Sequence, residues 1–179
     1  MTRTLFQPAQ ARAIADAFEH CGVQYLFIGK SAAILLGFPG MTQDVDVFPA
    51  RTPENGKRII AALESIGFDL DDKLKQAIVA CLDFVQIKSG PFDVDLVFAP
   101  DGIANFAEAK ERSILLDGFR IANLRDIISS KRASGREKDL IDLQLLERFR
   151  QEFEKQNTPP LRSAKDITRG HRKKESPQE

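Results

Sequence analysis

The chain has 179 residues, the length of one ordinary domain, and 42% of them are hydrophobic, so a packed core can form. The 26 basic residues balance 26 acidic ones, which argues against a domain that coats nucleic acid through bulk charge alone. The charge is uneven along the chain. Residues 155–179 hold seven basic and three acidic residues, a net charge of +4, so residues 1–154 carry −4. An acidic body with a basic end is compatible with bound divalent cations and a polyanionic partner.

The cysteines and histidines argue against a zinc site. Cys21 and Cys81 lie far apart without metal-ligand spacing, and His20 and His171 are the only histidines. We expect both thiols to be buried and reduced. No signal-peptide pattern opens the sequence, and no apolar run approaches the roughly 20 residues of a membrane span. The sequence therefore predicts a cytoplasmic protein with no membrane partner.

Hydrophobic periodicity, together with glycine and proline stops, divides the chain into helices and strands. In chain order, the predicted elements are a helix at 11–21, a strand at 25–28, a helix at 31–36, a strand at 44–48, a helix at 59–66, strands at 82–88 and 92–98, a short helix at 103–109, a strand or strand pair at 113–121, and helices at 124–133 and 137–154. The strands at 82–98 are typical of a hairpin. The pattern predicts an α+β domain, α/β-like in its layers, with a mixed sheet of four or five strands flanked by helices.

The last predicted helix carries one apolar stripe, which we expect to pack on the core. The stripe consists of Leu140, Leu143, Leu146, Phe149 and Phe153. After Lys155 the apolar pattern disappears, and prolines and scattered charges follow. We therefore predict one domain over residues 1–154 and a basic, disordered tail over residues 155–179.

Two aspartates stand close together on the predicted strand at 44–48. Asp44 and Asp46 are two residues apart, so both side chains leave the same face, while Val45 and Val47 point to the core. Neighbouring carboxylates repel each other, and folding alone gives no reason to align them. A divalent cation would turn that repulsion into coordination. The alternative interpretation is an acidic, solvent-exposed face of an edge strand.

The predicted strand at 92–98 repeats this design. Asp93 and Asp95 share one face, and Val94 and Leu96 share the other. Beside the first strand, it would supply the third carboxylate of a two-metal site, in which Mg²⁺ or Mn²⁺ ions lie about 3.5–4 Å apart and assist phosphoryl transfer. Asp83 could reach the same face, but we interpret it as a structural surface residue.

A strand that runs through a glycine into a helix precedes the first acid pair. Gly29 lets the backbone approach a phosphate, and the start of the helix offers free amide groups to it. Lys30 and Ser31 would add a positive charge and a hydroxyl. This pattern is weak evidence alone, and it gains weight from the paired aspartates that follow.

These motifs together resemble the signature of the DNA polymerase β-like nucleotidyltransferase superfamily. That signature is a hydrophobic residue, Gly, then Gly or Ser, a spacer of about a dozen residues, and two acids that flank a hydrophobic residue. The likeness is to the small bacterial branch that includes AbiEii-type toxins and minimal nucleotidyltransferases. The positions that match the pattern of this branch are Ala32, Gly37, Pro39, Thr42, Asp44 and Asp46.

The resemblance extends to the later motifs and spans roughly residues 10–150. Asp95 matches the third carboxylate and is favoured over Asp93, and the helices from Leu124 onward match a Lys, Arg, Lys-Asp helix pair. By this likeness Lys131 contacts the triphosphate of the substrate. The alternative for Lys131 is an exposed lysine favoured by the helix dipole. Arg136, Lys138 and Asp139 have the alternative of local ion pairs on the last helix.

The resemblance implies an enzyme that moves a nucleoside monophosphate from an NTP such as ATP to a hydroxyl and releases pyrophosphate. The implied acceptor is tRNA or a partner protein, often in a toxin–antitoxin or phage-defence pair with an antitoxin protein. Asp44 and Asp46 would hold Mg²⁺ or Mn²⁺ together with Asp95, which would also help to deprotonate the acceptor. The implied substrate-binding residues are Gly29, Lys30, Ser31, Thr42 and Lys131.

Two positions depart from the family pattern. Lys30 replaces the second glycine, and Gly40 replaces the arginine that follows the proline. Lys30 either crowds the phosphate loop or replaces the missing positive charge. The departures keep a second function open, namely a catalytically degenerate module of the same fold that binds a nucleotide or a protein.

Overall fold

The computed structural model describes residues 4–157, so the predicted tail from residue 158 onward lies outside the described residues. The helices are α1 (Pro8–His20), α2 (Gly29–Leu35), α3 (Pro53–Ser65), α4 (Asp72–Val79), α5 (Phe106–Arg112), α6 (Leu124–Ser134) and α7 (Glu137–Gln156). The strands are β1 (Tyr25–Phe27), β2 (Asp44–Pro49), β3 (Phe84–Ile87), β4 (Asp93–Val97), β5 (Ile114–Leu116) and β6 (Phe119–Ile121). The domain boundary predicted at residue 154 falls inside α7, which continues to Gln156.

Within residues 4–157, six strands form one mixed sheet in the order β3-β4-β2-β1-β6-β5. The predicted α+β class with a mixed sheet is confirmed, but the predicted four or five strands are one or two too few. The extra strand arises because the segment 113–121 forms two strands of three residues, β5 and β6, and both join the same sheet. The predicted hairpin is the antiparallel pair β3 and β4. Strand β2 runs parallel to β4 and antiparallel to β1.

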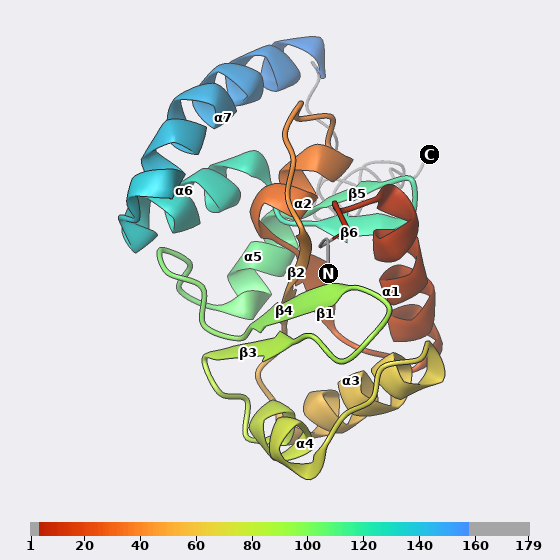
Figure 1. Ribbon diagram of the computed structural model, residues 1–179. Helices are drawn as coiled ribbons and strands as arrows, with labels where there is room; N and C mark the ends of the chain where they lie inside the picture. Colours follow the sequence, from red (N-terminus) through yellow and green to blue (C-terminus); the bar gives the residue numbers. More distant parts are fainter. Residues whose placement is uncertain (1–3, 158–179) are drawn as a thin grey trace, which may run out of the picture.

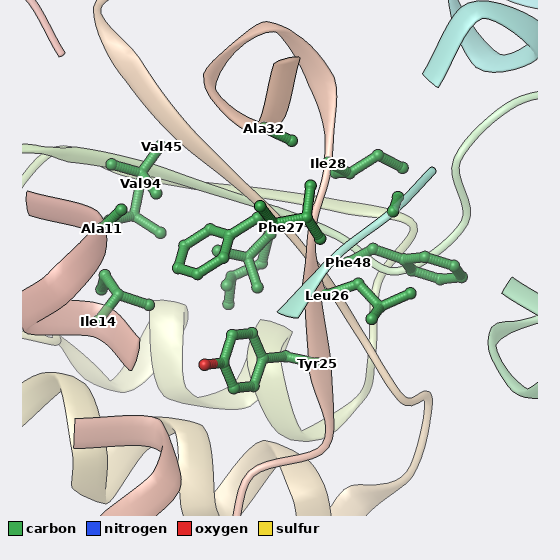
Figure 2. Close-up of a cluster of buried hydrophobic side chains, with 14 of the residues drawn as sticks. Ala11, Ile14, Tyr25, Leu26, Phe27, Ile28, Ala32, Val45, Phe48 and Val94 are labelled. Atoms are coloured by element: carbon green, nitrogen blue, oxygen red, sulfur yellow. The ribbon is translucent and has the colours of Figure 1, made fainter. Parts of the chain in front are cut away.

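One face of the sheet is apolar and packs against α1, and the acids lie on the other face. Val45 of β2 and Val94 of β4 are fully buried, and Figure 2 shows them beside Ala11 and Ile14 of α1. Successive side chains of a strand alternate between faces. The aspartates of β2 and β4 therefore lie on the opposite face, away from α1.

Helices α6 and α7 form a separate pair, which Figure 1 shows at the far side of the molecule from α3 and α4. Gly135, in the left-handed region with φ +64°, ends α6 two residues before α7 begins. Leu143 and Leu146 are buried as expected. Leu140 is 53% exposed, so the predicted stripe is wrong there. The reason is that the first turn of α7 buries its neighbour Asp139, which is 2% exposed.

Helix α4 has no counterpart in the sequence prediction. It begins at a side-chain cap, in which the backbone N–H of Leu74 donates to Oδ1 of Asp71 at 2.7 Å. Of its side chains, only Ile78 is fully buried. So small an apolar face gives too little periodicity for a sequence pattern to show.

The two cysteines differ in burial. Cys81 is buried as expected, whereas Cys21 is only half-buried because it caps the exposed end of α1. Both are free thiols. Between residues 4 and 157, the helices are all too short or too polar to cross a membrane.

Candidate functional site

The register of β2 and β4 brings the predicted acids together. Asp44 lies opposite Asp93, and Asp46 lies opposite Asp95, on neighbouring parallel strands. Residues paired in this way point to the same face of the sheet. Asp46 and Asp95 are therefore side by side, and Asp44 lies one step along the same face.

The electrostatics of this face show that its negative charge is poorly compensated. Burial raises the pKa of Asp46 to about 8, and the charges of Asp95 and Asp44 add to the rise. Burial also raises the pKa of Asp95 to about 6, with Asp44 as the next contribution. A hydrogen bond at 3.2 Å, donated by Nε2 of Gln86 to Oδ1 of Asp95, opposes that rise. The arrangement favours a proton or a cation on this face.

The carboxylates supply the donor atoms that a hard divalent cation prefers. Oδ1 of Asp44 is buried and accepts no hydrogen bond from the described residues, a costly state for a polar atom unless an ion or another ligand satisfies it. Within residues 4–157, no three or more Asp, Glu, His or Cys side chains are already gathered as a metal cage. Mg²⁺ needs no such cage, because it commonly binds one or two carboxylates, waters and substrate phosphates. The residues present therefore fit Mg²⁺ or Mn²⁺.

The turn from β1 into α2 is built around Asp46. A Cβ on Gly29 would lie 2.5 Å from Oδ2 of Asp46, so no larger residue fits while that carboxylate keeps its place. The backbone N–H of Ile28 donates to the carbonyl of Asp46 at 3.0 Å. Ser31 is fully buried, and its hydroxyl accepts from the backbone N–H of Asp46 at 3.1 Å. The hydroxyl that we expected to contact phosphate thus fixes α2 to β2.

The two lysines predicted to bind substrate both lie against acids of α7. Nζ of Lys30 is 3.0 Å from Oδ1 of Asp142. Nζ of Lys131 is 3.1 Å from Oδ1 of Asp139 and 3.7 Å from Oδ2 of Asp142. These contacts join the start of α2 to α6 and α7, and they place both ammonium groups at the cavity described below.

Asp139 is the centre of this ionic cluster. Its Oδ2 accepts from Nε of Arg136 at 2.8 Å and from the Ser134 hydroxyl at 2.7 Å. Burial acts to raise the pKa of Asp139, but the hydrogen bonds from Ser134 and Lys131 outweigh it and lower the pKa to about 2. The local ion pair between Arg136 and Asp139, which was the alternative interpretation of this motif, is therefore present.

Lys30 and Gly40, the two departures from the sequence pattern, lie close together. A Cβ on Gly40 would lie 2.7 Å from the ring of Phe38 and 3.1 Å from Cε of Lys30. A side chain at position 40 would collide with the ring and crowd the lysine stem. The absence of a side chain there leaves room for Lys30 to reach Asp142.

An open cavity of about 790 Å³ lies above the acids. Asp44, Asp46 and Asp95 line it, as do both lysines and Thr42, which stands just before β2. Its volume falls within the range of about 300–1,000 Å³ that is usual for small-molecule sites. Asp83 also lines the cavity, but its carboxylate is exposed and paired with Arg51 at 2.6 Å.

Two residues of the site, Gln86 and Asp142, are not predicted from the sequence. Gln86 lies opposite Asp95 in the β3–β4 register, and the two-residue alternation of β3 was the signal that places it on the acid face. Asp142 follows Asp139 by three residues, a spacing that puts both on one side of a helix. Neither spacing predicts which residue the side chain contacts, because Gln86 contacts Asp95 on another strand and Asp142 contacts Lys30 on another helix.

No family model and no curated protein matches the chain. Solved structures do match it, among them lincomycin-bound LnuA, a lincosamide antibiotic adenylyltransferase. Its TM-score is 0.57 at 16% identity, and the match covers 80% of this chain and 98% of LnuA. The chain has the nucleotidyltransferase fold. JHP933 from Helicobacter pylori also matches, with a TM-score of 0.49, 17% identity, and coverage of 82% of this chain and 66% of JHP933. The likeness is one of fold, and the AbiEii-type branch stays a prediction.

Proposed function

We propose that this protein is a metal-dependent nucleotidyltransferase, which moves a nucleoside monophosphate from an NTP to an acceptor hydroxyl and releases pyrophosphate. One observation carries the proposal. Asp44, Asp46 and Asp95 share one face and line the cavity, where burial and then the charges of Asp95 and Asp44 raise the pKa of Asp46. The nucleotidyltransferase fold of LnuA supports it.

In this proposal Asp44 and Asp46, with Asp95, hold Mg²⁺ or Mn²⁺, which when bound neutralises charge on the transferring phosphoryl group. Gly29 leaves space for the Asp46 carboxylate, and Ser31 holds the backbone of that residue against α2. Both residues therefore position the acid, and the backbone at Gly29 lines the cavity where phosphates would lie.

The transfer itself requires one bond to form and one to break. The acceptor oxygen bonds to the α-phosphorus, the bond from that phosphorus to the bridging oxygen breaks, and pyrophosphate leaves. Asp95, whose Oδ1 is held by Gln86, receives the hydroxyl proton on its carboxylate. Lys30 and Lys131 supply positive charge to the leaving pyrophosphate, and Thr42 lies at the same cavity wall.

Several acceptors are consistent with this chemistry. The family resemblance favours tRNA or a partner protein, in a toxin–antitoxin or phage-defence pair with an antitoxin. The name of LnuA describes adenylylation of a lincosamide antibiotic. Small hydroxyl compounds are therefore a further acceptor class to test, and ATP is the first NTP to test.

A binding-only module of the same fold is the second candidate function. The observation that favours it is that Lys30 and Lys131 both form ion pairs with carboxylates of α7. A module would bind an NTP with Mg²⁺ but release no pyrophosphate. An enzyme must exchange these carboxylates for substrate phosphates in every cycle.

The test is incubation of the purified protein with each α-labelled NTP, Mg²⁺, total tRNA and a cell extract. We expect label on an acceptor with the wild type and none with Asp44→Asn. Asp16→Asn, an exposed residue of α1, is the matched control and should label like the wild type. Binding of Mg²⁺ and NTP without any labelled acceptor would favour the module, and equal labelling by Asp44→Asn would contradict the assignment of the site.

A further inference from the structure

The cavity has two ends of different chemistry. At the end next to α2, the cations Lys30, Lys131 and Arg136 gather around carboxylates of α7. The second end, on the side of β3 and β4, is lined by Phe84 and Val97, together with the acid Asp83. Helix α2 follows β1, which lies on one side of β2, whereas β4 and β3 lie on the other side. The two ends therefore lie on opposite sides of β2, the strand that carries Asp44 and Asp46.

Phe84 is the largest apolar group at the second end. It opens the edge strand β3, is 54% exposed, and lies opposite Val97 in the β3–β4 register. Gln86, two residues further along β3, shares its face and donates to Asp95. The Phe84 ring therefore lies on the same face as the acids, adjacent to the side chain that contacts Asp95.

The geometry of phosphoryl transfer decides what each end receives. The attacking and leaving oxygens lie roughly in line, on opposite sides of the phosphorus. The leaving pyrophosphate is highly charged, so the end that holds the lysines and Arg136 suits it. The attacking hydroxyl must then approach the aspartates from the end that holds Phe84.

We infer that the Phe84 end of the cavity is the acceptor subsite, and that it accepts a small alcohol with an apolar, neutral or cationic body. This inference rests on the proposed function and narrows its acceptor. The Phe84 ring and Val97 offer apolar surface for such a body. The acceptor oxygen bonds to the α-phosphorus, its proton passes to Asp95, and pyrophosphate leaves.

The charges at this end argue against RNA as the acceptor. Asp83 and Asp95 line the cavity on this side. Among the described residues, Arg51 pairs with Asp83 at 2.6 Å, Lys88 follows the other end of β3, and Lys138 of α7 lines the cavity. RNA binding depends on several basic contacts to phosphates. A polynucleotide would instead bring its phosphates against carboxylates.

The test uses a cell extract divided into a small-molecule ultrafiltrate, an RNA fraction and a protein fraction. Each fraction is incubated with the wild type, Mg²⁺ and each α-labelled NTP. We expect labelled product from the ultrafiltrate, retained on a reversed-phase column longer than the free NTP or NMP. Label that appears in the RNA or protein fraction instead would overturn the inference while leaving the proposed function intact.

Phe84→Ala tests the residue itself with the same ultrafiltrate. Loss of the ring should raise the ultrafiltrate concentration needed for half-maximal labelling about tenfold, with the KM for NTP unchanged. Phe84→Tyr keeps an aromatic ring and should need about the same ultrafiltrate concentration for half-maximal labelling as the wild type. Leu115→Ala, an exposed residue on β5 at the far edge of the sheet, should behave like the wild type. An equal effect of Phe84→Ala and Leu115→Ala would overturn the inference. Labelling in no fraction would overturn the proposed function and the inference with it.

Discussion

Gly29 and Asp46 are packed so closely that a Cβ on Gly29 would lie 2.5 Å from Oδ2 of Asp46. Gly29 also has φ +69°, a backbone conformation that other residues adopt at a cost. Two independent constraints thus select glycine where β1 turns into α2. Gly29 therefore leaves space for the Asp46 carboxylate, and this role is separate from the approach of a phosphate that we propose for its backbone.

Gly29→Ala should separate these constraints when it is compared with Gly22→Ala. Gly22 has the same φ of +69°, and no atom of the described residues would lie within 4 Å of its Cβ. Each substitution should lower the free energy of unfolding by about 1–2 kcal/mol through backbone strain. Gly29→Ala should also displace Asp46 and abolish Mg²⁺-dependent pyrophosphate release. Equal activity of the two variants would show that the close packing has no catalytic consequence.

Asp46→Asn should stabilise the metal-free protein, and the gain should grow with pH. The pKa of Asp46 is about 8 in the folded state against an ordinary 3.8, so between these values the folded state binds the proton that the unfolded state has lost. Stability of the wild type therefore falls as pH rises from about 4 to 8, whereas the variant has no such group. Urea unfolding at pH 5 and pH 8, without Mg²⁺, measures the difference. A variant less stable than the wild type at pH 8 would contradict this electrostatic account.

Mg²⁺ should raise the melting temperature of the wild type and should do so more strongly at pH 8 than at pH 6. The reason is that a metal ion must displace the proton held by Asp46, so binding releases a proton and tightens as pH rises. Asp44→Asn should weaken the effect, because it removes a carboxylate whose Oδ1 accepts no hydrogen bond from the described residues. The Mg²⁺ shift is measured in thermal scans at both pH values. A shift independent of pH would argue that Asp46 does not bind the ion.

Asp139→Asn should destabilise the packing of α6 on α7. The carboxylate is buried and pairs with Lys131 and Arg136, and removing one partner of a buried pair costs on the order of 3 kcal/mol. The pKa of Asp139 is lowered to about 2, so its contribution is present above its ordinary pKa and is lost as pH falls toward 2. The two proteins should therefore converge in stability near pH 2. Glu64→Gln removes the exposed ion pair with Lys75 and should change stability little at any pH.

The acid strands could be predicted from the sequence because their signal is local. The alternation of Asp with apolar residues in β2 and β4 predicts both the strands and which side chains share a face. The burial of Val45 and Val94 confirms the predicted apolar face. The parallel register that sets Asp46 beside Asp95 is not local. A pattern that repeats on two strands only indicates that their acid faces can meet.

The ionic cluster could not be predicted in the same way. Lys30 and Asp142 are 112 residues apart in sequence, and only the packing of α7 near α2 brings them within 3.0 Å. The same packing buries Asp139 where the apolar stripe predicted Leu140. Periodicity describes which face of a helix is apolar on average, and it does not foresee a buried charge whose partners come from another helix.

Pyrophosphate release from NTP, measured with Mg²⁺ titration for the wild type and Asp46→Asn, tests the central claim most directly. We predict release that depends on Mg²⁺ in the wild type, is lost on chelation, and is lost in the variant although its fold is at least as stable. Release by Asp46→Asn at the wild-type rate, or release by the wild type that persists without divalent cation, would contradict the account.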